Sequence, residues 1–336
     1  MQKVSDFIFT ERERQIEWRK KNISSQEWGF QNKKQYPHIV PKHLWMETVW
    51  KGIRTDLKNY LKDKEIHPHT GTHNLCSSWV VCANLYFPIR NNISLKKLMA
   101  KFLSKELSLP ITEVIDVELE FALDGASHPS QLLGEEGGNR GSGQTSPDVA
   151  FILTANGKKC LILTECKYTE HSFYSCSART TEDSETRKAN PHPEKCMIAA
   201  SGYDYKPICH QTVWGRKYWS NIQLSDEGKK QFSRCPAATA GYQLFRQQAL
   251  ANGILKNADF DIVASTVSFD SRNEKLLHSL KATGVSNFKN QWGLMFDDQA
   301  IFKAWTHQDW VEFVRTNQVG NEWNGWLQYL ADRYGY

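Results

Sequence analysis

Apolar and polar residues alternate most clearly in the middle of the chain, where the pattern predicts consecutive strands of one sheet. Residues 114–123 alternate as the residues of a half-buried strand do. Residues 148–155 and 158–167 are β-rich runs on either side of Asn156-Gly157, a pair typical of a two-residue type I′ turn. The pattern therefore predicts a strand followed by a β-hairpin.

Helical spacing of apolar residues dominates the rest of the chain. Before the hairpin it predicts four helices, at residues 11–20, 43–63, 74–87 (ending before Pro88) and 95–107 (capped by Ser94). After the hairpin, helical spacing predicts helices at 242–253 (stopping at Gly253), 308–316 and 322–334. Between them, β-branched and apolar runs predict a buried strand at 261–269 and one or two short strands within 292–305. The succession of helices and strands indicates an α/β fold.

The turn also fixes which side chains of the hairpin face each other. If Asn156 and Gly157 are the two loop residues, Asp148 lies opposite Glu165, and Lys167 projects from the same face. Like charges opposed across about 5 Å destabilise a sheet, so the two carboxylates need a compensating partner. A divalent cation such as Mg²⁺ or Mn²⁺ is the simplest one, because hard cations take oxygen ligands. The alternatives are a hairpin whose charges face solvent and a β-bulge that changes the register.

The same residues carry a resemblance to a known family. Pro147-Asp148 followed by Glu165-Cys166-Lys167 resembles the motif of the PD-(D/E)xK nuclease superfamily, and the order of elements resembles a group of restriction endonucleases within it. The resemblance implies a restriction-endonuclease-like core with a central mixed β-sheet flanked by helices. It further implies that Asp148 and Glu165 bind the catalytic Mg²⁺ with help from the Cys166 carbonyl, that Lys167 acts in catalysis, and that DNA is the substrate.

Further carboxylates compete for a place in the expected acidic site. Glu118 and Glu120 share one face of the predicted strand at 114–123, where they either join the site or face solvent. Glu106, near the end of a helix, and Glu135 are two more candidates. The sequence leaves the choice among them open.

Two further segments are candidates for contact with DNA. The glycine-rich segment 134–143 is either a mobile loop over the site, with Arg140 available for a phosphate, or a plain linker. The helix after the hairpin presents Gln243, Arg246 and Gln247. In the superfamily that the chain resembles, the corresponding helix often presents polar groups to the site, and the alternative is a polar face in solvent.

The polar stretch 170–235 has few aliphatic residues and is not expected to order itself by apolar burial alone. It nevertheless contains four cysteines: Cys176, Cys196, Cys209 and Cys235. Four thiols in such a segment suggest a bound metal that replaces a core, and His210 can substitute for one thiol. Some nucleases of the superfamily carry a four-cysteine [4Fe–4S] cluster. Zn²⁺, [4Fe–4S] and unliganded thiols all remain open.

The remaining cysteines and a histidine-rich turn have simpler interpretations. The other four cysteines lie in apolar surroundings and are predicted to be buried packing residues: Cys76, Cys82, Cys160 and Cys166. The turn contains His67, His69 and His73, which either bind a metal or face solvent.

Composition and charge restrict the protein class. The chain has 336 residues, enough for one large domain or two small ones, and its net charge of +5 permits a basic DNA-binding face without requiring one. It has no apolar run of about 18 residues and no signal-peptide pattern, so we expect a cytoplasmic protein without contact to a membrane.

We therefore expect three regions and one leading function. The regions are a helical N-terminal part (1–110), a nuclease core (111–306) with a cysteine-containing insertion (170–235), and C-terminal helices (307–336). The function is Mg²⁺-dependent DNA endonuclease activity in restriction, phage defence or repair, in association with a further protein of such a complex. The alternative is a non-catalytic nucleic-acid-binding or scaffold protein with a four-cysteine metal site.

Overall fold

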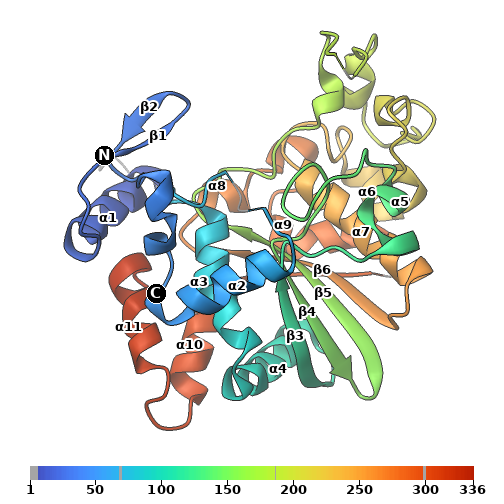
Figure 1. Ribbon diagram of the computed structural model, residues 1–336. Coiled ribbons are helices and arrows are strands. Elements are labelled where there is room, and N and C mark those ends of the chain that lie inside the picture. Colours follow the sequence, from blue (N-terminus) through green and yellow to red (C-terminus); the bar gives the residue numbers. More distant parts are fainter. Residues whose placement is uncertain (1–6, 68–69, 186, 298–299) are drawn as a thin grey trace, which may run out of the picture.

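A five-stranded mixed sheet lies at the centre of the protein (Figure 1). The computed structural model describes residues 7–67, 70–185, 187–297 and 300–336. In spatial order the strands are β3 (Ile111–Leu119), β4 (Val149–Ala155), β5 (Lys158–Lys167), β6 (Ile262–Phe269) and β7 (Ile301–Thr306). The β3–β4 and β4–β5 pairs are antiparallel, and the β5–β6 and β6–β7 pairs are parallel. The fold is thus α/β with a mixed sheet, which confirms the predicted class.

The hairpin has the register that its turn predicts. Ala155 pairs with Lys158, and Val149 pairs with Thr164, with no shift along β4 and β5. Asn156 and Gly157 both have positive φ angles, 49° and 78°, as a type I′ turn requires. No bulge intervenes, so the next residues outward, Asp148 and Glu165, come from opposed positions.

One face of the sheet is covered by three helices: α3 (Ser78–Arg90), α4 (Ile93–Leu107) and α10 (His307–Asn317) (Figure 1). Helix α11 (Asn324–Tyr334) packs on their outer side against α10. The apolar side chains of these helices and those of the sheet form one core that draws on all three expected regions, including Leu85, Phe151 and Trp310. The helical N-terminal and C-terminal regions therefore share one apolar core with the sheet.

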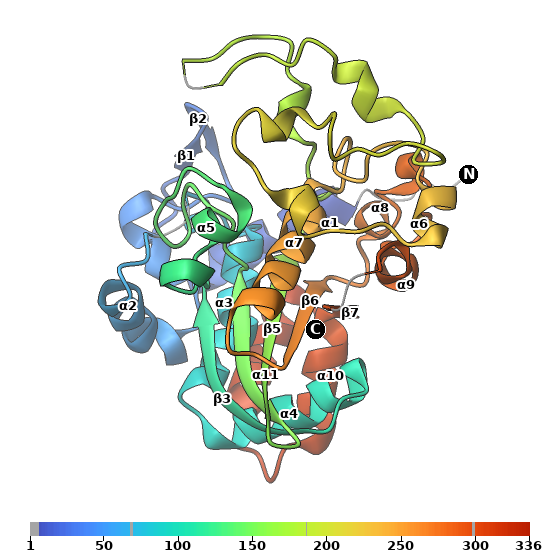
Figure 2. The same cartoon turned by 90° about the vertical axis from the view of Figure 1, so that its right-hand side faces the viewer.

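The opposite face is covered by α7 (Tyr242–Asn257), with α5 (Pro129–Leu133) and α6 (Asp226–Gln231) beside it (Figure 2). The segment 170–235 also packs here, through short 3₁₀ turns. It buries several large side chains in the second core: Phe173, Tyr205, Tyr218, Trp219, Ile222 and Phe232. The expectation that this segment lacks an apolar core was therefore wrong, because aromatic rather than aliphatic residues supply its burial.

The N-terminal region starts with α1 (Phe7–Asn22), which confirms the first predicted helix, and a small hairpin of β1 (Gly29–Gln31) and β2 (Lys34–Tyr36). The predicted helix at 43–63 is only partly correct. Its first half forms the 3₁₀ turns Lys42–Thr48 and Lys51–Ile53, and only α2 (Arg54–Asp63) is α-helical. The helix is interrupted at Trp50, whose backbone N–H donates to Oδ1 of Asn84 at 2.6 Å instead of to its own helix.

Two predicted helix boundaries also differ, for reasons that lie elsewhere in the fold. Helix α3 continues through Pro88 to Arg90. The carbonyl of Asn84, which loses its helical partner to the proline, accepts the indole N–H of Trp326 at 2.8 Å. Helix α4 is capped by Asn92, which accepts the Leu95 N–H at 2.9 Å, and not by Ser94.

The elements after the insertion follow the predictions with one further correction. Helix α7 continues past Gly253 to Asn257, and a Cβ at Gly253 would only come into van der Waals contact, 3.4 Å, with Leu132 and Asn221. The short helices α8 (Glu274–Leu277) and α9 (Phe288–Gln291) precede β7. Among the described residues, no helix is long and apolar enough to cross a membrane.

Candidate active site

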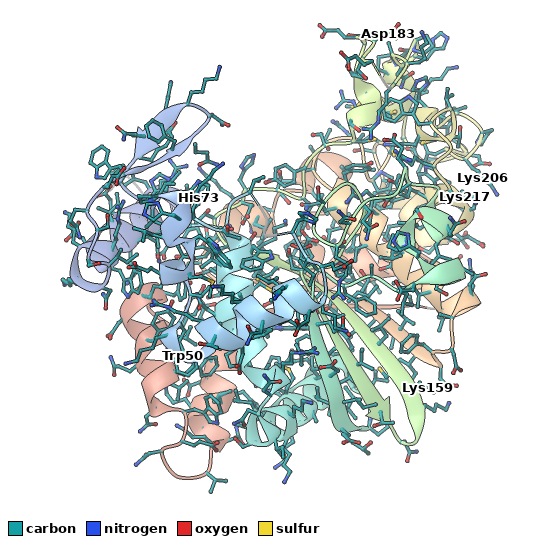
Figure 3. All side chains as sticks on the ribbon, viewed as in Figure 1. Trp50, His73, Lys159, Asp183, Lys206 and Lys217 are labelled. Atoms are coloured by element: carbon teal, nitrogen blue, oxygen red, sulfur yellow. The ribbon has the colours of Figure 1, made fainter. Side chains whose placement is uncertain are left out.

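The charged residues of the hairpin meet at the end of the sheet that lies opposite the turn. Asp148 immediately precedes β4, and its Oδ2 accepts the backbone N–H of Cys166 at 2.7 Å. Glu165 and Lys167 are at the C-terminal end of β5, and the Lys167 ammonium donates to Glu165 Oε1 at 2.7 Å. Glu165 and Lys167 are buried and Asp148 is half-buried. The turn end, marked by Lys159, lies at the far end of the same strand (Figure 3).

The electrostatics of this group follow from placing like charges in a poorly solvated position. Burial, and then the neighbouring carboxylate of Glu165, raise the pKa of Asp148 well above its usual range. Burial alone would lower the pKa of Lys167, but the carboxylates of Glu165, Glu170 and Asp148 outweigh it and raise the pKa. The ammonium therefore stays charged, and it partly balances the carboxylates.

A third carboxylate, Glu120, joins the group from the end of β3. Its backbone has a positive φ of 48°, which is uncommon for a residue other than glycine. The regular alternation of side chains along β3 ends at this residue. Its side chain is buried, and burial followed by the charge of Glu165 raises its pKa to about 8. Glu118 has a different environment, since it pairs with Arg140 at 2.8 Å and with Lys64 at 3.4 Å.

The other two candidate carboxylates do not reach this group. Glu135 accepts hydrogen bonds from the backbone N–H of Thr145 at 2.6 Å and from the Tyr218 hydroxyl at 2.9 Å. Glu106 lies in the last turn of α4 and lines a hollow with Lys303 of the edge strand β7, two strands away from β5.

The glycine-rich segment lies against the acidic group and not apart from it. A Cβ on Gly141 would stand 3.2 Å from the carboxyl carbon of Glu120, so the loop passes directly over this side chain. Arg140 donates to the carbonyls of Glu120 at 2.8 Å and Leu119 at 2.7 Å. Because these bonds and the Glu118 pair engage Nε and Nη2 of its guanidinium, Arg140 holds the backbone of Glu120 in place.

Two residues beyond β5 belong to the site although the sequence reasoning did not select them. Glu170 contributes to the raised pKa of Lys167, and its Oε2 accepts the backbone N–H of Tyr168 at 2.9 Å. The ring of the exposed Tyr174 lies 5.6 Å from the Lys167 ammonium. Proximity in sequence to Lys167 was the one available signal for both.

The donor set suits a hard divalent cation. Asp148, Glu165 and Glu120 supply carboxylate oxygens from three adjacent strand ends, the ligand type that Mg²⁺ and Mn²⁺ prefer. Burial, and then the charge of Glu165, raise the pKa of Asp148 and of Glu120, and a bound cation would offset both effects by favouring the ionised carboxylates. Within the part of the chain that the structure describes, no three His, Cys, Asp or Glu side chains are already arranged to hold a metal ion.

The polar residues of α7 differ in their burial. Gln247 is buried, and its amide donates to the carbonyls of Leu163 at 3.3 Å and Thr266 at 2.9 Å. The expectation that Gln247 contacts DNA does not fit this burial; it braces α7 on β5 and β6. Arg246 is half-buried over the ring of Tyr242 at 5.0 Å, and Gln243 is half-buried.

The histidines considered as ligands are occupied or lie outside the described residues. Nε2 of His210 lies 3.1 Å from the Lys188 carbonyl, and Nε2 of His73 lies 3.1 Å from the Phe30 carbonyl. His69 lies outside the described residues, and Nδ1 of His67 lies 3.4 Å from the Asn139 amide. The predicted burial of Cys76, Cys82, Cys160 and Cys166 is confirmed.

Comparison with known proteins identifies the family of the chain. No curated protein and no solved structure shows significant similarity to the chain. A family model described as REase-ARP, restriction endonuclease associating with ARP, matches residues 12–335 and thus includes the whole sheet and every residue of the acidic site. The α/β fold with its mixed sheet and a nuclease-like role are consistent with that description. The chain belongs to the family of restriction endonucleases associating with ARP.

Proposed function

We propose that this protein is a metal-dependent deoxyribonuclease that hydrolyses phosphodiester bonds within DNA and uses Mg²⁺ or Mn²⁺. The observation that carries the proposal is the meeting of Asp148, Glu165 and Lys167 at opposed strand ends, with the charge contacts given above. Family membership supports the same reaction class.

Each residue has a role that its surroundings define. Asp148, Glu165 and Glu120 would hold the cation, and the Cys166 N–H orients one oxygen of Asp148. The bound cation supplies Lewis-acid activation of water and offsets charge on the phosphate. The neighbouring carboxylates raise the pKa of Lys167, which favours the ammonium form, so it would act as a fixed positive charge near the phosphate.

The test is cleavage of supercoiled and linear DNA with and without Mg²⁺. We expect nicking or linearisation of the supercoiled form only with the cation, and a loss of about 100-fold or more in Lys167→Met, Asp148→Asn and Glu165→Gln. The matched control is Lys159→Met, which removes an exposed lysine from the other end of the same strand.

The outcomes separate the proposal from its alternatives. Cleavage of linear DNA from its ends alone would indicate an exonuclease. Wild-type protein that binds DNA but never cleaves it with either cation would favour the non-catalytic nucleic-acid-binding or scaffold function. Full activity in any one of the three site variants would remove that residue from the assignment.

The biological setting follows from the family description. We infer that the protein acts in restriction or a related defence or repair process together with the ARP protein for which the family is named. Co-purification of the two proteins tests this association, and it is independent of the cleavage assay.

A further inference from the structure

The four cysteines of the insertion are far apart in sequence but lie together in the fold. We call them the four-cysteine cluster: Cys176, Cys196, Cys209 and Cys235. The backbone N–H of Cys235 donates to the Cys196 carbonyl at 3.0 Å. Cys176 and Cys209 each precede a short 3₁₀ turn, and the turn after Cys176 packs against the other two turns of the cluster.

The sulfurs are also within electrostatic range of one another. Burial raises the pKa of every thiol in the cluster. In addition, the charge of Cys176 raises the pKa of Cys196, Cys209 and Cys235, that of Cys196 raises the pKa of Cys209 and Cys235, and that of Cys209 raises the pKa of Cys235. Three of the thiols are only half-buried, and Cys235 is buried. The insertion thus concentrates four thiols on the outer side of the second core.

Hydrogen-bond donors are directed at the sulfurs in a repeated pattern. The backbone N–H two residues after the cysteine donates toward the sulfur and lowers the thiol pKa, against the larger effect of burial, in three cases: Ala178 for Cys176, Gln211 for Cys209, and Ala237 for Cys235. The Gln211 side-chain amide adds a further bond to the Cys176 sulfur at 3.1 Å. Such donors stabilise thiolates much more than neutral thiols, and N–H bonds to sulfur are typical of metal-thiolate centres.

Aromatic burial holds part of this segment on the second core, but regular secondary structure does not hold it in shape. Among its described residues, the stretch from 170 to 225 contains 3₁₀ turns of three to five residues but no α-helix and no strand. A segment of this length without regular structure is uncommon in a compact domain, and a metal that links distant residues stabilises it directly.

We propose that the four-cysteine cluster binds one thiophilic metal centre through its thiolates. Thiolate ligands select zinc or an iron–sulfur cluster over Mg²⁺, so this centre is separate from the carboxylate site in both place and chemistry. In the described structure no three of its side chains close on one point, so binding requires rotation of cysteine side chains. The centre orders the insertion beside α7 and does not take part in hydrolysis.

Metal analysis of the full-length protein tests this directly. Protein prepared without oxygen from cells supplied with both metals should contain either about one zinc ion, or about four irons with a visible absorption band, per chain. The first result identifies a zinc site and the second an iron–sulfur cluster. Protein that contains neither metal, or that joins these cysteines in disulfide bonds, would overturn the proposal.

Variants then assign the metal to the cluster. Cys196→Ser and Cys209→Ser replace half-buried thiols and should reduce the metal content at least about tenfold, while the segment 170–235 becomes sensitive to protease. Cys76→Ser, at a buried cysteine outside the insertion, is the matched control and should keep the metal. Retention of the metal by both insertion variants would refute the site.

X-ray absorption of the wild-type protein covers the case in which these variants fail to fold. Sulfur as the only ligand type of the bound zinc or iron supports the cluster. Nitrogen or oxygen ligands would instead place the metal elsewhere and contradict the proposal. Because neither measurement depends on DNA cleavage, the metal centre and the nuclease function can fail separately.

Discussion

At the scale of single residues, the charge balance around Lys167 explains how three carboxylates can lie together at one end of the sheet. The lysine is buried, and the charges of Glu165, Glu170 and Asp148 outweigh burial and raise its pKa, while Glu165 also accepts its hydrogen bond at 2.7 Å. Lysine alone does not neutralise the group, since the pKa of Asp148 and that of Glu120 stay raised. A cation therefore has a clear electrostatic reason to bind, and the contribution of each acid can be measured.

We expect Glu120→Gln to weaken Mg²⁺ binding at least about tenfold, because the change removes one carboxylate from the proposed ligand set. Isothermal calorimetry with Mg²⁺ alone measures this. Glu118→Gln is the control, since Glu118 is two residues away but pairs with Arg140 and Lys64. Equal Mg²⁺ affinities in the two variants would exclude Glu120 from the site.

We expect the protein to lose stability as the pH falls from about 6.5 to about 4. Burial lowers the pKa of His307 to about 4, so the unfolded chain takes up a proton in this range while the folded protein does not. The contribution of this histidine amounts to about 3 kcal/mol over the full range. His38 has a similarly lowered pKa, again because of burial, and adds to the effect.

Chemical denaturation of His307→Asn at several pH values checks this contribution. The variant should lose part of the pH dependence, whereas His192→Asn, at an exposed position, should keep it. A slope in His307→Asn as steep as that of the wild type would show that His307 does not cause the acid sensitivity.

At the scale of elements, α7 is held on the sheet by polar contacts as well as apolar ones. The Gln247 amide reaches the backbones of both β5 and β6, the two parallel strands at the centre of the sheet. Gln247, which the sequence pattern offers as a candidate for DNA contact, is therefore part of the protein interior. Its neighbour Gln248 is likewise buried and donates to the Ala300 carbonyl at 3.1 Å.

We expect Gln247→Ala to destabilise the protein by about 1–3 kcal/mol, because two buried carbonyls lose their donor. The affinity of the folded protein for DNA should not change. Urea denaturation and a DNA-binding titration provide the two measurements, with the half-buried Gln243→Ala as the control on the same helix. A DNA affinity that falls in Gln247→Ala without any loss of stability would restore Gln247 as a DNA contact.

At the scale of the whole molecule, one arginine connects the two ends of the chain. Arg333 of α11 is fully buried, and its guanidinium donates to Gln15 of α1 at 3.0 Å, to the Leu75 carbonyl at 3.4 Å and to the Thr48 carbonyl. It also lies 4.5 Å from the ring of Trp18. The N-terminal region is thus fastened to the C-terminal helix.

We expect Arg333→Met to cost about 3 kcal/mol and to increase hydrogen exchange in α1, because several buried acceptors lose their donor at once. Arg315→Met on α10 is the control, since Arg315 is largely exposed and pairs with Glu312. Unchanged exchange in α1 of the folded variant would show that other contacts hold the N-terminal region.

The sequence by itself determined the hairpin and the identity of its charged residues. Turn chemistry at Asn156-Gly157 sets the register, and strand alternation then carries that register to Asp148, Glu165 and Lys167. Both effects act over a few residues, so no knowledge of the rest of the fold was needed.

Only the tertiary structure decided the features that depend on distant partners. Helix α3 passes through Pro88 because Trp326 satisfies the carbonyl that the proline leaves free. Glu120 rather than Glu118 reaches the acidic site because the strand ends at Leu119, where the backbone changes direction. The burial of Gln247 and the meeting of the four cysteines have the same origin: each depends on contacts between segments far apart in sequence, which no local pattern specifies.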